Sequence, residues 1–154
     1  NLHVAFVGDL KYGRTVHSLV IALCNYNTTF HLVSPVELKL PRSVKLHIKE
    51  KNLTYHQYTN VEEVIPNVDI LYMTRIQKER FSDPLEFERI KNAYILNKNM
   101  LVSTRENFRV LHPMPRVNEI DINVDSDPRA YYFQQALNGV YVRQALLTIM
   151  LGYR

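Results

Sequence analysis

Cysteine, long apolar segments and clusters of basic residues are scarce or missing in this chain of 154 residues. The single cysteine, Cys24, cannot form an internal disulfide, and its apolar neighbours favour a place in the core. No apolar run approaches the roughly 20 residues that a transmembrane helix needs, which argues against membrane insertion. Lysine and arginine are dispersed, so the net charge of +4 favours a basic cleft for a small anion over a nucleic-acid surface.

Targeting signals are also missing from the sequence. Because no signal or transit peptide is visible and cysteine is rare, we expect a reducing intracellular compartment, most simply the cytoplasm. The first predicted strand begins almost at the first residue, which suggests that a preceding part of the protein is not included. These are expectations from the sequence alone.

The length and composition are those of one globular domain that spans residues 1–154. Hydrophobic residues make up 46% of the chain and charged residues 22%, which is typical of a folded protein with a core. A chain of this size is expected to bury roughly two thirds of its unfolded surface. We find no internal repeat and no low-complexity segment.

Hydrophobic periodicity predicts alternating strands and helices. Strands are expected at residues 2–7, 30–33, 53–58, 68–73 and 108–111. Helices are expected at residues 16–23, 43–51 and 61–65, and in a C-terminal helix with an apolar face of Val142, Ala145, Leu146, Ile149 and Met150. The polar segment at residues 81–108 is typical of a long, mobile loop that carries a short helix.

This alternation predicts an α/β fold in three layers, a doubly wound, mostly parallel five-stranded sheet with helices on both faces. Ligands of such folds lie beyond the carboxyl ends of the strands, where loops and helix N-termini converge. Three segments that carry arginine follow predicted strands, at residues 8–15, 74–80 and 112–116. The sequence therefore predicts that these segments form one site.

The first segment, Gly-Asp-Leu-Lys-Tyr-Gly-Arg-Thr at residues 8–15, has the glycine spacing of a P-loop. It has Arg14 where a P-loop has lysine, and the predicted strands end in no Walker-B aspartate, so an NTPase is not favoured. A tight turn with solvated Lys11 and Arg14 is the plainer alternative. However, a cation at a helix start opposes the helix dipole, which favours an anionic ligand beside Arg14.

The second segment places Arg75 and Gln77 directly after an apolar strand. A guanidinium offers paired donors that match a carboxylate, and Gln77 adds a neutral donor. Glu79 is four residues beyond Arg75 and could hold its guanidinium in one orientation. The alternative is an ordinary charged surface at residues 78–80.

The third segment, His-Pro-Met-Pro-Arg at residues 112–116, contains two prolines after a predicted strand. The prolines remove two backbone donors and leave carbonyl acceptors that suit an amide or an amine. The Met114–Pro115 peptide is the candidate for a cis bond. We interpret His112 as a structural histidine that bonds to backbone, and no metal site is expected because no partner with ligand spacing is evident.

Together these segments resemble the aspartate-binding half of the catalytic chains of aspartate carbamoyltransferases. The resemblance covers nearly the whole chain and is most specific at residues 8–19, 73–80, 112–117 and 132–136. It implies transfer of the carbamoyl group of carbamoyl phosphate to L-aspartate, which gives N-carbamoyl-L-aspartate and phosphate for pyrimidine synthesis. It implies no cofactor, no metal and no nucleic-acid partner.

The resemblance also implies residue roles. Arg14 would hold the α-carboxylate of aspartate, and Arg75 with Gln77 would hold the β-carboxylate. Glu79 would orient Arg75.

The backbone carbonyls of Met114 and Pro115 would contact the carbamoyl nitrogen and the attacking amine. Lys11, Tyr12 and Glu86 match residues whose contacts change between states of low and high affinity.

Parts of the family pattern are absent from this chain. The phosphate-binding Ser-Thr-Arg-Thr-Arg run and the loop lysine of a neighbouring subunit are not found, so the carbamoyl-phosphate-binding domain is expected to be a separate, preceding part. Asn118 stands where many relatives have an aspartate that bonds a loop tyrosine, and Phe87 is near that tyrosine's place. Relatives form trimers of catalytic chains, often joined to zinc-containing regulatory chains.

Two alternatives remain open. Ornithine carbamoyltransferases carry a cysteine in the His-x-x-Pro segment, and here that segment is His112-Pro113-Met114-Pro115, without cysteine. Paired arginines also suit a dicarboxylate better than a substrate with a cationic side chain. The other alternative is a non-catalytic module that binds a dicarboxylate.

Overall fold

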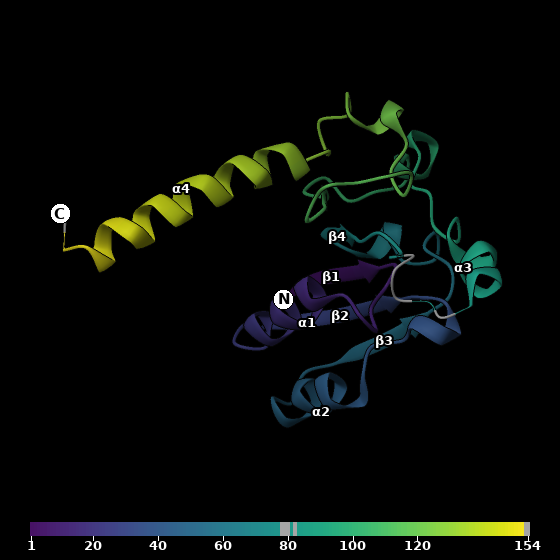
Figure 1. The fold of residues 1–154 in the computed structure, drawn as a ribbon, viewed down its shortest axis with the longest axis horizontal. Coiled ribbons are helices and arrows are strands. Elements are labelled where there is room, and N and C mark those ends of the chain that lie inside the picture. Colours follow the sequence, from purple (N-terminus) through teal and green to yellow (C-terminus); the bar gives the residue numbers. More distant parts are fainter. Residues whose placement is uncertain (78–80, 82, 153–154) are drawn as a thin grey trace.

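The structure, a computed structural model, describes residues 1–77, 81 and 83–152. Five parallel strands form one sheet in the order β3-β2-β1-β4-β5. They are β1 (Leu2–Val7), β2 (Thr28–Val33), β3 (Tyr55–Tyr58), β4 (Ile70–Met73) and β5 (Arg109–Leu111) (Figure 1). All five predicted strands are confirmed, although β3, β4 and β5 are shorter than the apolar runs that predicted them.

The strand order reverses beside β1. The chain passes outward from β1 to β2 and β3, and then returns to place β4 on the other side of β1. Val7, the last residue of β1, lies between Val33 of β2 and Met73 of β4. Loops that leave β1 and β4 diverge at such a switch point, and the crevice between them is where this class of sheet binds ligands.

One face of the sheet is covered by two α-helices, α1 (Arg14–Leu23) and α2 (Arg42–Glu50). Their buried side chains recur at helical spacing, and they pack on alternate residues of the inner strands, since neighbouring strand residues face opposite sides. This core contains Val16, Val20, Val44 and Ile48 from the helices, and Phe6, Phe30 and Leu32 from the strands. Cys24, just after α1, is buried in it, as predicted.

The opposite face is covered mainly by loops and short 3-10 helices. These are η2 (Ile65–Asn67), η4 (Lys98–Leu101) and η5 (Ile122–Val124), which bury Ile65, Leu101 and Val124 against the sheet. The predicted three-layer α/β fold is therefore confirmed, with lighter helical cover on this face. The helix expected at residues 61–65 is a turn that leads into η2.

The segment predicted as a loop with a short helix contains α3 (Pro84–Ile90). Asp83 caps this helix because its carboxylate accepts a hydrogen bond from the backbone N–H of Leu85 at 2.8 Å. A further 3-10 turn, η1 (Val36–Leu38), follows β2.

The C-terminal helix, α4 (Tyr132–Met150), projects away from the rest of the molecule (Figure 1). The helix is where the sequence predicted it, but the predicted apolar face is not a core face. Leu146, Ile149 and Met150 are 54%, 73% and 81% exposed, and Tyr132 is the buried residue at its root. The prediction was wrong because apolar residues occur all around this helix, a composition typical of a helix enclosed by other protein.

Within the described ranges 1–77, 81 and 83–152, no helix combines the length and apolar character needed to cross a membrane.

The buried histidine of β2 makes stability sensitive to acid. Burial, with further contributions from His3 and His56, lowers the pKa of His31 to about 4. Between that value and the usual 6.5, the unfolded chain binds a proton that the folded chain does not, so the free energy of unfolding falls as the pH falls from about 6.5 to about 4. The loss can reach about 3 kcal/mol.

We therefore expect His31→Phe to flatten this dependence, because phenylalanine keeps a ring at the position but cannot bind a proton. Urea denaturation at several pH values between 4 and 7 measures the slope. His47→Gln, a change on α2, is the control and should leave the slope unchanged. If His31→Phe has the same slope as the unaltered chain, other groups cause the acid sensitivity.

Candidate functional site

A cavity of about 210 Å³ lies at the carboxyl edge of the sheet, where the strand order reverses. Its walls come from the loops that follow β1, β4 and β5, so the three segments singled out in the sequence meet here. The lining residues are Asp9, Tyr12, Gly13, Arg14, Thr15, Thr74, Arg75, Gln77, His112, Pro113, Met114 and Pro115. The predicted convergence of these segments is confirmed.

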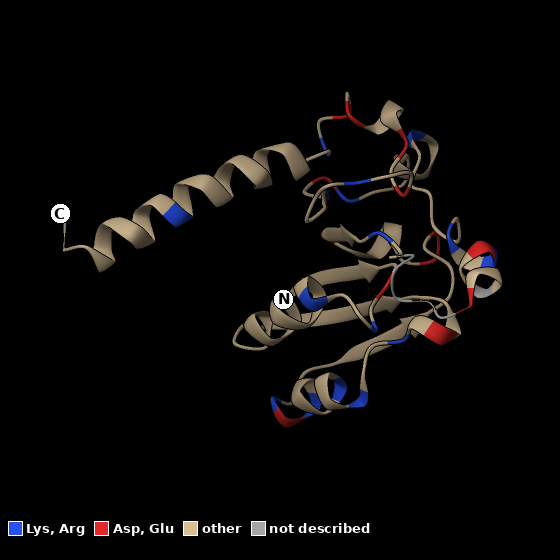
Figure 2. Cartoon of the chain, viewed as in Figure 1, with Lys and Arg blue, Asp and Glu red and all other residues tan. Residues whose placement is uncertain are grey.

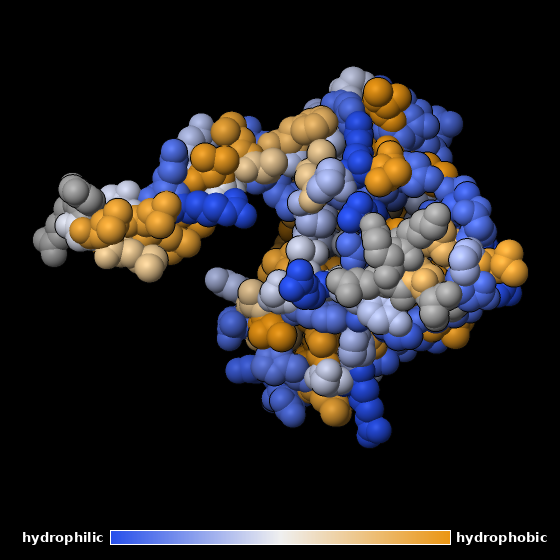
Figure 3. Space-filling model, viewed as in Figure 1, coloured by the Kyte–Doolittle hydropathy of each residue, from blue (hydrophilic) through white to orange (hydrophobic). Residues whose placement is uncertain are grey.

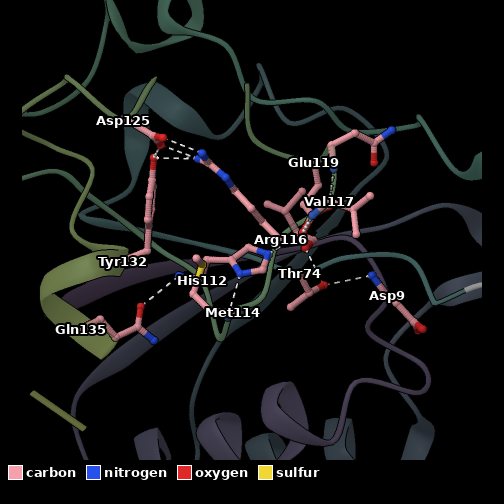
Figure 4. Close-up of polar contacts among 12 residues, drawn as sticks. Asp9, Thr74, His112, Met114, Arg116, Val117, Glu119, Asp125, Tyr132 and Gln135 are labelled. Carbon is pink, nitrogen blue, oxygen red and sulfur yellow. Dashed lines mark hydrogen bonds and ion pairs between the residues drawn. The ribbon is translucent and has the colours of Figure 1, made fainter. Parts of the chain in front are cut away.

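The β1 and β4 loops are tied together directly below the cavity. The Thr74 hydroxyl donates to the carbonyl oxygen of Val7 at 2.9 Å and accepts from the backbone N–H of Asp9 at 3.1 Å (Figure 4). Gly8 lies between them with φ +114°, and a Cβ at Gly8 would lie 2.3 Å from the carbonyl oxygen of Thr74. Glycine is therefore required here both for its backbone angle and for the close approach.

The β1 loop then turns into α1. The carboxylate of Asp9, which is buried, accepts a hydrogen bond from the backbone N–H of Tyr12 at 2.9 Å and so closes the turn. A Cβ on Gly13 would lie 2.5 Å from the carbonyl oxygen of Asp9, so a larger residue does not fit at this turn.

Arg14 is the first residue of α1. Gly13 at the N-cap supplies no side-chain hydrogen bond, and the first turn contains no acidic residue. The partial positive charge of the helix N-terminus and the Arg14 guanidinium are therefore both available at the cavity, where they favour a bound anion.

Arg75 and Gln77 reach the same cavity from the loop after β4, and both side chains are partly exposed. They also line a second cavity of about 260 Å³ on their other side, which Phe87, Lys91 and Asn118 help to enclose. The two residues thus form a wall between two hollows. Asn118 in turn donates through its side-chain amide to the Asn92 oxygen at 2.5 Å, which links the loop after β5 to the segment after α3.

The proline segment after β5 has the cis peptide that its sequence predicted, between Met114 and Pro115. His112 supports this turn, since its Nδ1 accepts from the backbone N–H of Met114 at 2.8 Å (Figure 4). The backbone N–H of His112 donates to the Gln135 side chain on α4 at 2.9 Å. The structural interpretation of His112 is therefore confirmed.

Sequence reasoning missed the residue that anchors this turn, Glu119. Its side chain is buried, and its carboxylate lies 2.7 Å from His112 Nε2 and accepts from the backbone N–H groups of Val117 and Asn118 (Figure 4). Burial alone would raise the pKa of Glu119, but the hydrogen bonds from His112 and from backbone outweigh it, so the pKa lies below its ordinary value. Nothing in the local sequence distinguishes Glu119 from a surface glutamate.

A second missed group fixes the end of the proline segment. Arg116 binds both carboxylate oxygens of Asp125, and the hydroxyl of Tyr132 at the root of α4 donates to the same carboxylate (Figure 4). The Arg116 hydrogen bonds hold the pKa of Asp125 below its usual range. Burial and the neighbouring Asp125 raise the pKa of Tyr132, which therefore stays neutral. Arg116 is thus used inside the protein and is not offered to a ligand.

The remaining predicted residues stand as follows. Tyr12 lines the cavity, and Lys11 Nζ lies 4.9 Å from the centre of the Tyr12 ring without lining the cavity itself. Glu79 and the side chain of Glu86 lie outside the described part of the chain, so their proposed roles stay predictions.

The arrangement has a clear chemical character. Two arginines and a glutamine, with a helix N-terminus and the cis-proline turn, surround one small cavity at the edge of the sheet. Such a set favours a small polyanion that also has a polar group to meet the backbone of residues 113–115.

The chain is similar to known proteins in both sequence and structure. Residues 1–150 match the family model described as aspartate/ornithine carbamoyltransferase, Asp/Orn binding domain. The chain is 58% identical over 153 residues to the aspartate carbamoyltransferase catalytic subunit of Bacteroides fragilis, and the match covers 99% of this chain and 50% of that protein.

Solved structures are similar as well. The catalytic subunit of M. jannaschii aspartate transcarbamoylase has a TM-score of 0.91 and 44% identity, over 99% of this chain and 50% of that one. The aspartate transcarbamoylase of Trypanosoma cruzi in complex with N-(phosphonacetyl)-L-aspartic acid has a TM-score of 0.82 and 36% identity, over 96% of this chain and 46% of that one. The chain thus spans about half the length of the relatives that it matches.

The anchoring role of Glu119 can be tested by Glu119→Gln. The new amide keeps one oxygen but turns an NH₂ group toward backbone donors, so we expect a loss of about 2 kcal/mol in the free energy of unfolding. Because the pKa of Glu119 is lowered in the folded chain, its stabilisation is present above the unfolded pKa and is lost as the pH falls through the folded value. Urea denaturation at pH 7 measures the effect, with the exposed Glu106→Gln as control. Equal stability of the two variants would contradict the role.

Proposed function

Because the chain belongs to the aspartate/ornithine carbamoyltransferase family, whose Asp/Orn binding domain its residues 1–150 match, we propose that it acts as the aspartate-binding half of an aspartate carbamoyltransferase. The reaction transfers the carbamoyl group of carbamoyl phosphate to the amino group of L-aspartate. A carbon–nitrogen bond forms as the carbon–oxygen bond to phosphate breaks. The product, N-carbamoyl-L-aspartate, enters pyrimidine synthesis.

The observation that carries this proposal is the meeting of Arg14 and Arg75 at one cavity from two different loops. L-Aspartate has two carboxylates separated by a short carbon skeleton, so it needs two cationic groups on opposite sides of a small space. Arginine suits both positions because its planar donors match a carboxylate in pairs. A cavity of about 210 Å³ leaves room for a ligand of that size.

In the proposed complex, Arg14 and the N-terminus of α1 hold the α-carboxylate. Arg75 and Gln77 hold the β-carboxylate, and Glu79 orients Arg75. This assignment uses the helix dipole for one carboxylate and the paired donors of Arg75 with a neutral amide for the other.

The proline turn completes the site. The backbone carbonyls of Met114 and Pro115 accept hydrogen bonds from the attacking amine and from the carbamoyl nitrogen. The protein then acts mainly by holding two reactants in attack geometry, which can supply roughly 7 to 11 kcal/mol of the barrier. Charge on the carbonyl oxygen and on the leaving phosphate is stabilised by groups of the other domain.

Aspartate is favoured over ornithine as the second substrate. The cavity presents arginine at two points, which would repel the cationic side chain of ornithine. The similar Bacteroides fragilis and M. jannaschii proteins are named for aspartate, and the ligand in the Trypanosoma cruzi structure contains an L-aspartic acid group.

A separate carbamoyl-phosphate-binding domain is part of the proposal, so residues 1–154 form one of two domains. Ten large apolar residues of α4 and its C-cap are exposed, and Arg143 is the one charged residue between Tyr132 and Met150 (Figures 2 and 3). At the root of α4 a hollow of about 680 Å³ has a mixed lining, with Leu2, Ile70, Leu111 and Tyr131 beside the polar residues Asn1, Asn27, Asp69, Asn107 and Arg109. The carbamoyl-phosphate-binding domain packs on α4 and fills this hollow, because so much apolar surface is costly in water.

Assembly and regulation follow the family in this proposal. The whole protein forms a cytoplasmic homotrimer of catalytic chains, which zinc-containing regulatory chains can join. Lys11, Tyr12 and Glu86 change contacts between states of different affinity. No cofactor takes part in the transfer.

We expect the 154-residue chain alone to show no carbamoyl transfer, because the phosphate-binding groups belong to the other domain. Calorimetry should detect weak binding of L-aspartate and almost none of carbamoyl phosphate. Adding the carbamoyl-phosphate-binding half of the Bacteroides fragilis relative should restore measurable product formation. Carbamoyl transfer by the rigorously pure chain alone would refute the proposal that the phosphate-binding groups belong to the other domain.

The same mixing experiment tests the role of α4. Leu146→Glu and Ile149→Glu, on the outer part of the helix, should prevent restoration while leaving aspartate binding by the chain unchanged. Thr148→Glu adds the same charge at a polar position between them and serves as the control. Full restoration with the two glutamate variants would contradict docking on α4.

The role of Arg75 in aspartate binding can be tested in a protein that contains both this chain and the carbamoyl-phosphate-binding domain. Arg75→Ala should weaken aspartate binding roughly ten- to hundredfold, since a charge-assisted hydrogen bond contributes about 1.5 to 3 kcal/mol. Carbamoyl phosphate binding should change far less. Arg75→Lys keeps the charge without the paired donors and should give a smaller defect, and exposed Arg42→Ala on α2 is the control. Equal damage to both substrates would contradict the assigned role.

A further inference from the structure

Three histidines lie close together on one face of the sheet, His3 near the amino end of its strand and His31 and His56 at mid-sheet, and none of them lines the arginine cavity. His3 belongs to β1, His31 to β2 and His56 to β3. His31 and His56 are directly opposite each other in the β2–β3 pairing. His31 is buried, whereas His3 is partly exposed and His56 is exposed.

The first two imidazoles are separated by the distance expected of two ligands on one metal ion. His3 Nδ1 lies 3.2 Å from His31 Nε2, and the two rings share a hydrogen bond. Two nitrogens bound tetrahedrally at the usual zinc–nitrogen length of about 2.05 Å lie about 3.3 Å apart. An ion bonded to both nitrogens at that length would lie off the line that joins them, so both rings must turn and the proton of their hydrogen bond must leave.

The surroundings of the pair agree with such a role. His31 meets His3 through Nε2, and its other ring nitrogen, Nδ1, is buried without a hydrogen-bond partner among the residues that the structure describes, so Nε2 is the nitrogen that can bind an ion shared with His3. His3 Nε2 lies 3.2 Å from the side-chain amide of Asn1, which can turn its oxygen to accept from that nitrogen.

Other charged groups near the pair are already engaged. The Asp69 carboxylate accepts from the backbone N–H of His3 at 2.7 Å and from Arg105 at 2.9 Å. The available ligands are thus nitrogens, which suit zinc, copper or nickel and do not suit magnesium or calcium.

The geometry points to a binding site for a divalent transition metal ion, held by His3 Nδ1 and His31 Nε2, with His56 as a third ligand after rotation of its exposed side chain. Among residues 1–77, 81 and 83–152, no three His, Cys, Asp or Glu side chains are already arranged to hold a metal ion. His56 must therefore turn: its ring centre is 5.7 Å from that of His31, close to the 5.5 Å between His3 and His31. Water completes the coordination.

A bound ion would join three neighbouring strands, β1, β2 and β3, on one face of the sheet. Since the unfolded chain does not hold these histidines together, an ion that binds the folded chain must stabilise it. The site is independent of carbamoyl transfer, and its failure would leave the proposed function untouched.

Calorimetry with zinc chloride at pH 7.5 tests the site, with the N-terminus acetylated so that the α-amino group supplies no ligand. We expect one equivalent of zinc to bind and to raise the midpoint of thermal unfolding, whereas magnesium should do neither. His3→Gln and His31→Phe should each weaken zinc binding at least about tenfold, because each removes one of two principal ligands. His56→Gln should weaken it less.

His47→Gln, a histidine change on α2, is the matched control and should leave zinc binding unchanged. Circular dichroism checks that each variant folds, and His3→Gln decides the matter if His31→Phe does not fold. The inference is overturned if zinc does not bind, if it binds without raising the unfolding midpoint, or if His3→Gln binds it as well as the unaltered chain.

Discussion

The close contact between the ends of β1 and β4 is the constraint on which the site depends. Thr74 bonds both Val7 and Asp9, and Gly8 lets the two loops approach because it has no Cβ to meet the Thr74 carbonyl. The strand order reverses at this contact, so the loops separate just beyond it. Arg14 and Arg75 are carried by the separating loops, and the cavity between them follows from this one junction.

A second constraint holds the third wall of the cavity. The turn at residues 113–115 is supported from behind by His112, which is itself fixed by the buried carboxylate of Glu119. Glu119 also accepts hydrogen bonds from backbone N–H groups. Its carboxylate thereby supplies the acceptors that a strand or helix would provide and that this irregular segment lacks. Buried charge is costly, and its full set of partners explains why it is tolerated here.

The α4 helix shows why this fold is half of a larger arrangement in our proposal. It is attached to the sheet domain by Tyr132 and by the bond from His112 to Gln135, and beyond them its apolar side chains are exposed. Residues that fix the proline turn therefore also fix the root of α4. A domain docked on α4 would be connected mechanically, through these few contacts, to the wall of the cavity that Arg14 and Arg75 line.

The sequence by itself determined the strands, the α/β class and the family, because apolar periodicity and the motifs at residues 8–15, 74–80 and 112–116 are local patterns. It also predicted the cis peptide after Met114, and it singled out Arg14, Arg75 and Gln77, which line the cavity. Only the tertiary structure decided that α4 has no core face, that Glu119 and Asp125 anchor the proline segment, and that His3 and His31 meet across two strands. These facts depend on contacts between residues distant in sequence, and periodicity within one element carries no information about what lies opposite it.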